Sequence, residues 1–365
     1  MIINIFKILI ILSTISCSTK ISNFELYNQS FLSKSEFIPT KDQINKDKSN
    51  IIIYKINDKK SKLAIRAGLG NIATKNIETI IASNKIANII NRDNYQKLKD
   101  EITLSQLNNN FSYKGPIPAN YAIIGEISGS SFNSKYISSK ESFDEKTKKY
   151  NYTPPKYKYS GSVEGKVNII QLPNASIVKT IELKGDANGE ENINSNNIKI
   201  GKFQFSNQAL KPKEYDESIM QRSINDATYM IEEDIKNFFA PIGYISQKKK
   251  YKNKVIFKIS LGSNDGIKQN DKIYIYTKVR IKNDLTDQFE AETRYIGSAK
   301  ISNIINDTSS WIVLEDNKNN IKIRLGDIVK IKYDKSFAKK HNKTFDNFVK
   351  TFETITEILE LIAKQ

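Results

Sequence analysis

The chain has 365 residues, 39% of them hydrophobic and 10% aromatic, so it can bury the cores of about two domains. Lysine and arginine outnumber aspartate and glutamate by 57 to 40. The excess is almost entirely lysine, in a sequence that is also rich in isoleucine and asparagine. We therefore attribute it to biased composition rather than to nucleic-acid binding, with attraction to anionic lipid or cell-wall polymer as the alternative. A single cysteine excludes an internal disulfide.

The first 17 residues contain a short apolar run that ends at that cysteine. Residues 8–16 are about half as long as the roughly 20 apolar residues of a membrane-spanning helix, and they fit a secretory signal. Thr14-Ile15-Ser16-Cys17 resembles a bacterial lipobox, with Thr14 in place of leucine, as in relaxed spirochaete lipoboxes. The resemblance implies that the signal peptide, residues 1–16, is removed and that Cys17 carries acyl chains such as palmitate. The alternative is a membrane helix beside an incidental cysteine.

Residues 17–50 are polar, without a clear period, and are expected to form a lipidated tether. A first domain is expected at 51–243. Strands are predicted at 51–54, 121–128, 162–172, 177–183 and 198–205, and helices at 73–90, 92–101 and 218–239. Residues 173–175 are expected to form a turn and 185–197 a loop. The helix at 218–239 has the strongest pattern, with Asp216 or Ser218 as its N-cap.

A second domain is expected at 251–334. Its predicted strands are 255–261, 272–276, 295–305, 311–314 and 327–333, a spacing typical of a small barrel. Residues 267–275 and 323–331 repeat one pattern, in which Asn270-Asp271 and Gly326-Asp327 each precede an alternating strand. Asparagine and glycine both tolerate the positive φ that such a turn can require.

The C-terminal segment, 342–365, is predicted to be an amphipathic helix. Its apolar residues recur at spacings of three and four. They are Phe345, Phe348, Phe352, Ile355, Leu359 and Ile362. We expect this stripe to pack on the protein itself, on a second copy or on another protein. Membrane attachment is less favoured, because Glu353, Glu357 and Glu360 lie on the polar face.

Four stretches of the first domain carry a resemblance to the periplasmic domain of the curli-secretion channel family, CsgG. Residues 92–98 resemble the Arg-x-x-Leu-x-x-Leu segment of this family. Residues 119–127 resemble its strand that begins with Ala-Asp or Ala-Asn and has a central glycine. The paired strands at 167–170 and 177–180 and the helix at 218–239 follow in the same order. The same scaffold occurs in TolB amino-terminal domains and in LpoB-like activators of cell-wall synthases. The resemblance implies an α/β sandwich over 51–243.

Residues 255–333, with the turn at 261–267, resemble the small SH3-like β-barrel at the end of the flagellar accessory protein FlgT. The expected fold class is therefore α+β. A CsgG-like α/β sandwich is followed by a small SH3-like β-barrel and a C-terminal amphipathic helix. Such likeness in fold does not transfer function.

Candidate catalytic and metal-binding residues are few, and each has a simpler interpretation. His341 is the only histidine, too few for a typical zinc site. A catalytic triad would need it buried beside a serine, and an exposed, structural role is favoured. Gly68-Leu69-Gly70 lies where a dinucleotide-binding loop would, but a plain loop is favoured. Asp265, Asp271 and Asp327 fall in separate turns, so turn formation is favoured over calcium binding. We predict no enzyme activity, no cofactor and no metal site.

Tyr150, Tyr152, Tyr157 and Tyr159 flank Pro154-Pro155 with a period of two. They are candidates for contact with a partner on a projecting hairpin, or simply a solvated aromatic hairpin. Together with the lipobox, this pattern favours a non-enzymatic lipoprotein of the cell envelope. We expect anchoring to the outer membrane through Cys17, on the periplasmic or surface side. We expect it to act as an oligomeric assembly or scaffold component that binds other envelope proteins and no nucleic acid.

The alternatives are a CsgG-type outer-membrane secretion channel and an accessory factor for flagellar or cell-wall machinery. Curli channels place two membrane hairpins in insertions that correspond here to 130–160 and 185–215. The first insertion is crowded with lysine, aspartate and glutamate, and the second is rich in asparagine and glycine. Each charge facing lipid at mid-depth costs about 2–4 kcal/mol. We therefore expect contact arms rather than a pore.

Overall fold

The computed structural model describes residues 19–44, 48–90, 103–104, 106–107, 118–145, 147–193, 197–200, 203–206, 211–316 and 320–334. The chain divides into two compact units, Met1–Lys332 and Tyr333–Gln365. The described part is a β-rich α+β protein that contains two large sheets. Cys17, His341, the helix expected at 92–101 and the C-terminal helix expected at 342–365 lie outside the described residues.

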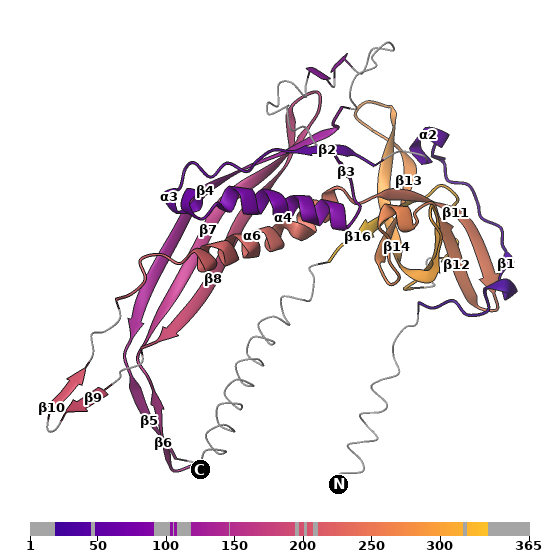
Figure 1. Cartoon of the computed structure of the whole chain (residues 1–365). Helices are drawn as coiled ribbons and strands as arrows, with labels where there is room; N and C mark the ends of the chain where they lie inside the picture. The colour runs from indigo at the N-terminus through magenta and orange to yellow at the C-terminus, as the bar shows by residue number, and fades with distance from the viewer. Residues whose placement is uncertain are drawn as a thin grey trace, which may run out of the picture. The chain divides into compact units, whose positions relative to one another are not determined.

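A five-stranded sheet forms the first of these (Figure 1). In the order β3-β2-β4-β7-β8 its strands are Asn88–Ile89, Asn50–Ile53, Tyr121–Ile137, Lys156–Gln171 and Ser176–Asn192. Strand β2 runs parallel to β3 and β4. Strands β4, β7 and β8 form an antiparallel meander. The predicted turn at 173–175 joins β7 to β8, where Gln171 pairs with Ser176.

The helices α4 and α6 lie side by side along one face of this sheet (Figure 1). The helices of this part are α3 (Lys62–Arg66), α4 (Leu69–Ser83) and α6 (Glu217–Phe238). The N-cap prediction for α6 is confirmed: the Asp216 carboxylate accepts from the Ser218 and Ile219 amides at 3.0 and 3.3 Å. The α6 stripe is buried, from Ile219 to Ile235.

Gly185 explains how closely α6 approaches β8. A Cβ built on Gly185 would collide with backbone atoms of Ser223 and Ala227. The helix backbone therefore rests directly on the strand, and only glycine fits beneath it.

Two predictions about the main sheet and its helices are wrong. The helix expected at 73–90 is α4, which ends at Ser83, and Ile89 belongs to strand β3. Lys85 has a φ of 52°, which breaks the helical path. The loop expected at 185–197 is the second half of β8, because the ladder to β7 continues to Lys156↔Asn192. Long-range pairing overrides the turn-forming composition there.

Two small hairpins extend this domain. Strands β5 (Lys140–Asp144) and β6 (Lys149–Thr153) pair with each other in the connection between β4 and β7. Strands β9 (Asn197–Ile200) and β10 (Phe203–Ser206) pair in the segment after β8, where a single strand was predicted. We call the first hairpin, residues 140–153, the arm.

The second large sheet closes into a six-stranded barrel. In ring order its strands are β11 (Ile242–Tyr251), β12 (Lys254–Ile259), β15 (Ser310–Leu314), β14 (Phe289–Ile305), β13 (Lys272–Lys282) and β16 (Ile328–Lys332). The ring closes where β16 pairs with β11. Phe257, Ile273 and Ile301 are fully buried. Strand β11 was not predicted, because its Lys248-Lys249-Lys250 run masks the alternation.

The internal repeat is confirmed as two copies of one turn. Asn270 and Gly326 have φ values of 72° and 88°. Asp271 then accepts from the Lys268 amide at 2.7 Å, and Asp327 from the Arg324 amide at 2.6 Å. The strands after the two turns pair with each other, with Ile273 opposite Ile331. The two aspartates therefore serve the turns, as favoured from the sequence.

The segment expected to be a tether has structure of its own. We call residues 19–44 the strap. It contains η1 (Phe24–Leu26), β1 (Asn28–Gln29) and α2 (Lys41–Ile44). Strand β1 extends the barrel sheet by pairing with β11, and the Ser35 amide donates to the Leu325 carbonyl at 2.9 Å. Backbone pairing does not depend on side-chain polarity, so a polar segment can still be held in place.

No helix among the described residues combines the length and the apolar character needed to cross a bilayer.

Candidate functional site

The four tyrosines predicted to contact a partner lie in two different environments. Tyr150 and Tyr152 belong to β6 of the arm, and their exposed fractions are 79% and 60%. Tyr157 and Tyr159 belong to β7, where Tyr157 is half-buried and Tyr159 is only 3% exposed. Only the first two are available to a partner of the folded chain.

Tyr159 belongs to an aromatic cluster at the outer end of the sheet. Its ring stacks on Phe132 with centroids 5.9 Å apart, and Tyr157 packs edge-on against Tyr136 at 5.6 Å. The Tyr159 hydroxyl donates to the Glu191 carboxylate at 3.3 Å. Ile219 of α6 closes the cluster from the helix side. The helix therefore makes Tyr159 a packing residue, which the alternation of tyrosines alone could not reveal.

The arm presents a second aromatic group to solvent. Phe143 and Tyr150 face each other across the β5–β6 ladder, with ring centroids 4.9 Å apart. Phe143 is 50% exposed. Tyr152 lies two residues from Tyr150, on the same side of the strand. An isolated two-stranded hairpin is only marginally stable in water, so contact of these rings with a partner would stabilise the arm.

Phe143 was not predicted as a contact residue. A signal for it exists, because Phe143 precedes the hairpin turn by about as many residues as Tyr150 follows it. Phe143 lies opposite Tyr150 only if the turn is centred at 145–148. The residues there are mostly charged and have no distinctive turn signature, so the sequence did not reveal this pairing.

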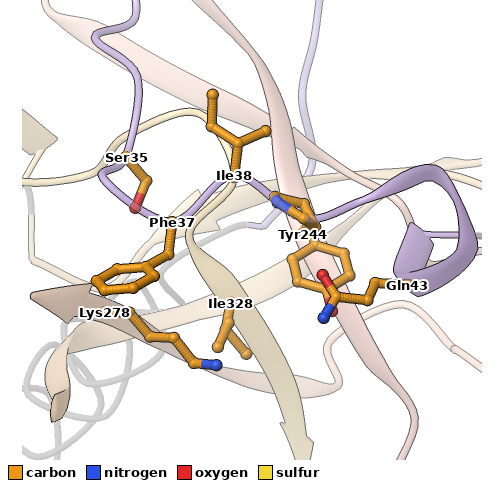
Figure 2. Close-up of a pocket in the computed structure, with 9 residues that line it drawn as sticks. Ser35, Phe37, Ile38, Gln43, Tyr244, Lys278 and Ile328 are labelled. Atoms are coloured by element: carbon orange, nitrogen blue, oxygen red, sulfur yellow. The ribbon is translucent and has the colours of Figure 1, made fainter. Parts of the chain in front are cut away.

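A small pocket of about 220 Å³ lies between the strap and the barrel (Figure 2). Figure 2 shows Phe37, Tyr244 and Ile328 around it, and the polar side chains of its lining are those of Ser35, Gln43, Tyr244 and Lys278. The pocket is smaller than the roughly 300–1,000 Å³ typical of ligand sites. It offers one amine, one side-chain amide and the hydroxyls of Ser35 and Tyr244, and the described residues that line it include no carboxylate and no imidazole.

The glycine-rich loop at 68–70 is the junction of α3 and α4. Gly68 has a φ of 63°, and the Gly70 amide donates to the Asp58 carboxylate at 3.1 Å. A Cβ on Gly70 would collide with the Ile56 carbonyl. Asp58 therefore already occupies the position at the start of α4 where a phosphate would bind.

The third candidate calcium ligand, Asp265, accepts from the Gly262 amide at 2.9 Å. Its role is local, like those of Asp271 and Asp327. Within the described ranges, no three histidine, cysteine, aspartate or glutamate side chains are grouped so that they could hold a metal ion.

The sequence matches no protein-family model and no curated protein. Among solved structures, a PelC dodecamer from Paraburkholderia phytofirmans is 11% identical, with 45% of this chain and 82% of that chain covered and a TM-score of 0.21. Lipoprotein GNA1162 from Neisseria meningitidis is 11% identical, with 41% and 87% covered and a TM-score of 0.21. The hypothetical protein CT253 from Chlamydia trachomatis is 14% identical, with 52% and 98% covered and a TM-score of 0.23. Similarity at TM-scores this low supports no argument about function.

Proposed function

We propose that this protein is a lipid-anchored component of the bacterial envelope that assembles with other proteins and catalyses no reaction. The observation that carries the proposal is the arm, where Phe143, Tyr150 and Tyr152 are exposed together on one hairpin. Exposed aromatic side chains that are grouped in this way are enriched where proteins bind each other. The two-stranded arm has little structural reason of its own to carry them.

The lipid anchor is proposed from the lipobox-like Thr14-Ile15-Ser16-Cys17. An anchor of two or more acyl chains holds a protein stably on a membrane, whereas a single chain does not. Labelled palmitate should enter the wild-type protein and should not enter Cys17→Ala. Equal labelling of the wild type and Cys17→Ala would contradict acylation of Cys17. Fractionation of inner and outer membranes tests the proposed outer-membrane location.

The fold assignments are proposed at the same level. The five-stranded sheet with two helices on one face supports a CsgG-like domain, because three of the four resembling stretches, 119–127, the paired strands at 167–170 and 177–180, and the helix at 218–239, lie in β4, β7, β8 and α6 in that order. The fourth, 92–98, lies outside the described residues. The six-stranded ring supports an SH3-like barrel of the FlgT type. Neither assignment selects between a scaffold and an accessory factor of flagellar or cell-wall machinery.

Photo-crosslinking in intact cells tests the arm. A photoreactive amino acid replaces Tyr150 or Tyr152, and the products are identified by mass spectrometry. The matched control carries the same group at Lys166, an exposed residue on β7. We expect a defined envelope protein, or a second copy of this chain, from the arm positions and not from Lys166. Crosslinks that are equal at all three positions would show that the arm is not a specific contact site. Sedimentation of the purified chain tests the proposed homo-oligomer.

The CsgG-type secretion channel remains the second candidate. One observation favours it: the two small hairpins, β5–β6 and β9–β10, occur in the two insertions where curli channels have membrane hairpins. Against it, the arm carries the exposed charges Lys140, Glu141, Lys148 and Lys149, each costing about 2–4 kcal/mol if it faced lipid at mid-depth. Purified protein in planar bilayers should therefore give no steady conductance. Uniform channels that vanish on deletion of 130–160 would favour the channel instead.

A further inference from the structure

The strap covers an apolar patch on the outside of the barrel. Ile256 of β12 and Trp311 of β15 form this patch, and Ile21, Phe24 and Tyr27 of the strap pack on it. Trp311 is 4% exposed, and Phe24 meets its ring edge-on at 5.2 Å. Burying large apolar side chains such as these stabilises the contact by removing their surface from water. The strap is therefore held on the barrel by packing as well as by backbone pairing.

The contacts begin at the first described residue of the strap. The Thr19 hydroxyl donates to the Asn270 side-chain carbonyl. The Ile21 amide donates to the Asn303 side-chain carbonyl at 2.7 Å, and the Asn303 amide group returns a bond to the Ile21 carbonyl at 3.4 Å. The chain is thus tied to the barrel from residue 19 onward.

This leaves almost no free chain between the proposed acylated residue and the barrel. Cys17 and Thr19 are separated by two peptide units, which span about 7 Å at most. A flexible spacer would instead let the barrel move tens of ångströms from the lipid. We propose that the barrel is seated directly on the bilayer surface, on the side where the strap begins. The proposal rests on the lipid anchor proposed for Cys17.

The side chains near the strap suit an anionic lipid surface. The β11–β12 hairpin carries five lysines within residues 248–254, and Lys250, Lys252 and Lys254 are exposed. Lys249 lies over the Phe24 ring at 4.2 Å and over the Trp311 ring at 5.5 Å. Lysines beside aromatic rings are typical of protein surfaces at the lipid headgroup region, and an anionic leaflet attracts each lysine that lies near it. The occupant of this face is therefore a bilayer with anionic headgroups.

The chain offers a single thiol and a single tryptophan for the test. Protein from Cys17 to Gln365 is coupled through Cys17 to a maleimide lipid in vesicles that contain phosphatidylglycerol and a dansyl-headgroup lipid. Energy transfer from Trp311 to dansyl reports the distance of the barrel from the surface. A variant with a twenty-residue Gly/Ser insert after Ser18 should show at least about two-fold less transfer, because such a linker separates its ends by tens of ångströms. The same insert after Leu285, in an exposed loop, is the matched control and should leave transfer unchanged.

Equal transfer from the wild type and the Ser18-insert variant would overturn the proposal, because the barrel would then not depend on the short connection. Chemical coupling makes this result independent of acylation in cells, which palmitate labelling tests separately. A failure of the anchor and a failure of the seating are thus distinguishable.

A second comparison tests the lysines. In phosphatidylglycerol vesicles, the triple variant of Lys250, Lys252 and Lys254 to glutamate should lower transfer, and in neutral phosphatidylcholine vesicles it should not. Reversal of Lys140, Lys148 and Lys149 on the arm is the matched control and should have no effect in either. Equal effects of the two triple variants would overturn the assignment of this face. Binding of the uncoupled protein to anionic cell-wall polymer but not to phosphatidylglycerol would overturn the choice of a bilayer as the occupant.

Discussion

The two large sheets differ in whether their edge strands are free: one closes into a ring and the other stays open. The barrel has its ring closed by β11 and β16, and the strap covers an apolar patch on its outside. The five-stranded sheet is open, because β8 is an edge strand over all of Ser176–Asn192. The arm projects from this sheet in the connection between β4 and β7. Open edges and projecting hairpins invite pairing with other chains, whereas a closed ring does not. This difference supports the protein contacts proposed for the arm of the first sheet.

The largest effect is expected where the strap meets the barrel. Trp311→Ala should lower the free energy of unfolding by about 3–5 kcal/mol, because the indole is buried between the two. Urea denaturation followed by circular dichroism measures the change. Leu285→Ala, at a residue that is 96% exposed, should change stability by less than about 0.5 kcal/mol. A Trp311→Ala variant as stable as Leu285→Ala would mean that the strap is not packed on the barrel.

The next largest effect concerns the contact of α6 with the open sheet. Gly185→Ala should destabilise the protein by about 1–3 kcal/mol, because the added methyl group meets the backbone of Ser223 and Ala227. Gly129→Ala is the matched control on β4, where a Cβ meets nothing within 4 Å. Thermal unfolding of both variants decides the point. If both tolerate alanine equally, α6 does not rest directly on β8.

A smaller, pH-dependent effect is expected from Asp327 in the barrel. Burial raises the pKa of this carboxyl above its usual value, and the Thr277 and Ser35 hydroxyls and the Arg324 amide offset part of the rise. The folded state therefore binds the proton more tightly than the unfolded state does. Wild-type stability relative to Asp327→Asn should rise as the pH falls through the folded-state pKa and level off below the unfolded-state value near about 3.9.

Urea midpoints of the wild type and Asp327→Asn, compared between neutral pH and about pH 3, test this sign. The asparagine variant is a suitable reference because its side-chain oxygen can still accept from the Arg324 amide. A wild type that instead loses stability relative to Asp327→Asn on acidification would contradict the raised pKa.

The smallest effect on stability is expected at the arm. Tyr150→Ser with Tyr152→Ser should change the free energy of unfolding by less than about 0.5 kcal/mol, since both rings are exposed. The same variant should lose co-purification of the crosslinked partner. Tyr159→Ser should do the reverse, losing stability through its packed ring. A double variant that keeps its partner would remove the arm from the proposed function.

Some features of the fold follow from short stretches of sequence. Helix α6 was predictable because its apolar period and its Asp216 cap lie within the same segment. The repeated turns were predictable because Asn270-Asp271 and Gly326-Asp327 combine a residue that tolerates positive φ with a side chain that caps the turn. Each of these signals lies within one short segment, and the structure confirms the helix and both turns that they predict.

Other features depended on partners far along the chain. Strand β8 extends past Gly185 only because β7 supplies its hydrogen bonds, and Tyr159 is buried only because α6 covers it. The strap looks like a polar spacer until Trp311 and the edge of β11 are placed beside it, more than two hundred residues later. The sequence by itself determined the α6 pattern and the paired turns, and it predicts a cleavable, lipobox-like start, whereas tertiary structure decided which tyrosines are free and where the strap lies. Burial and edge pairing are properties of the assembled chain, so no local pattern encodes them.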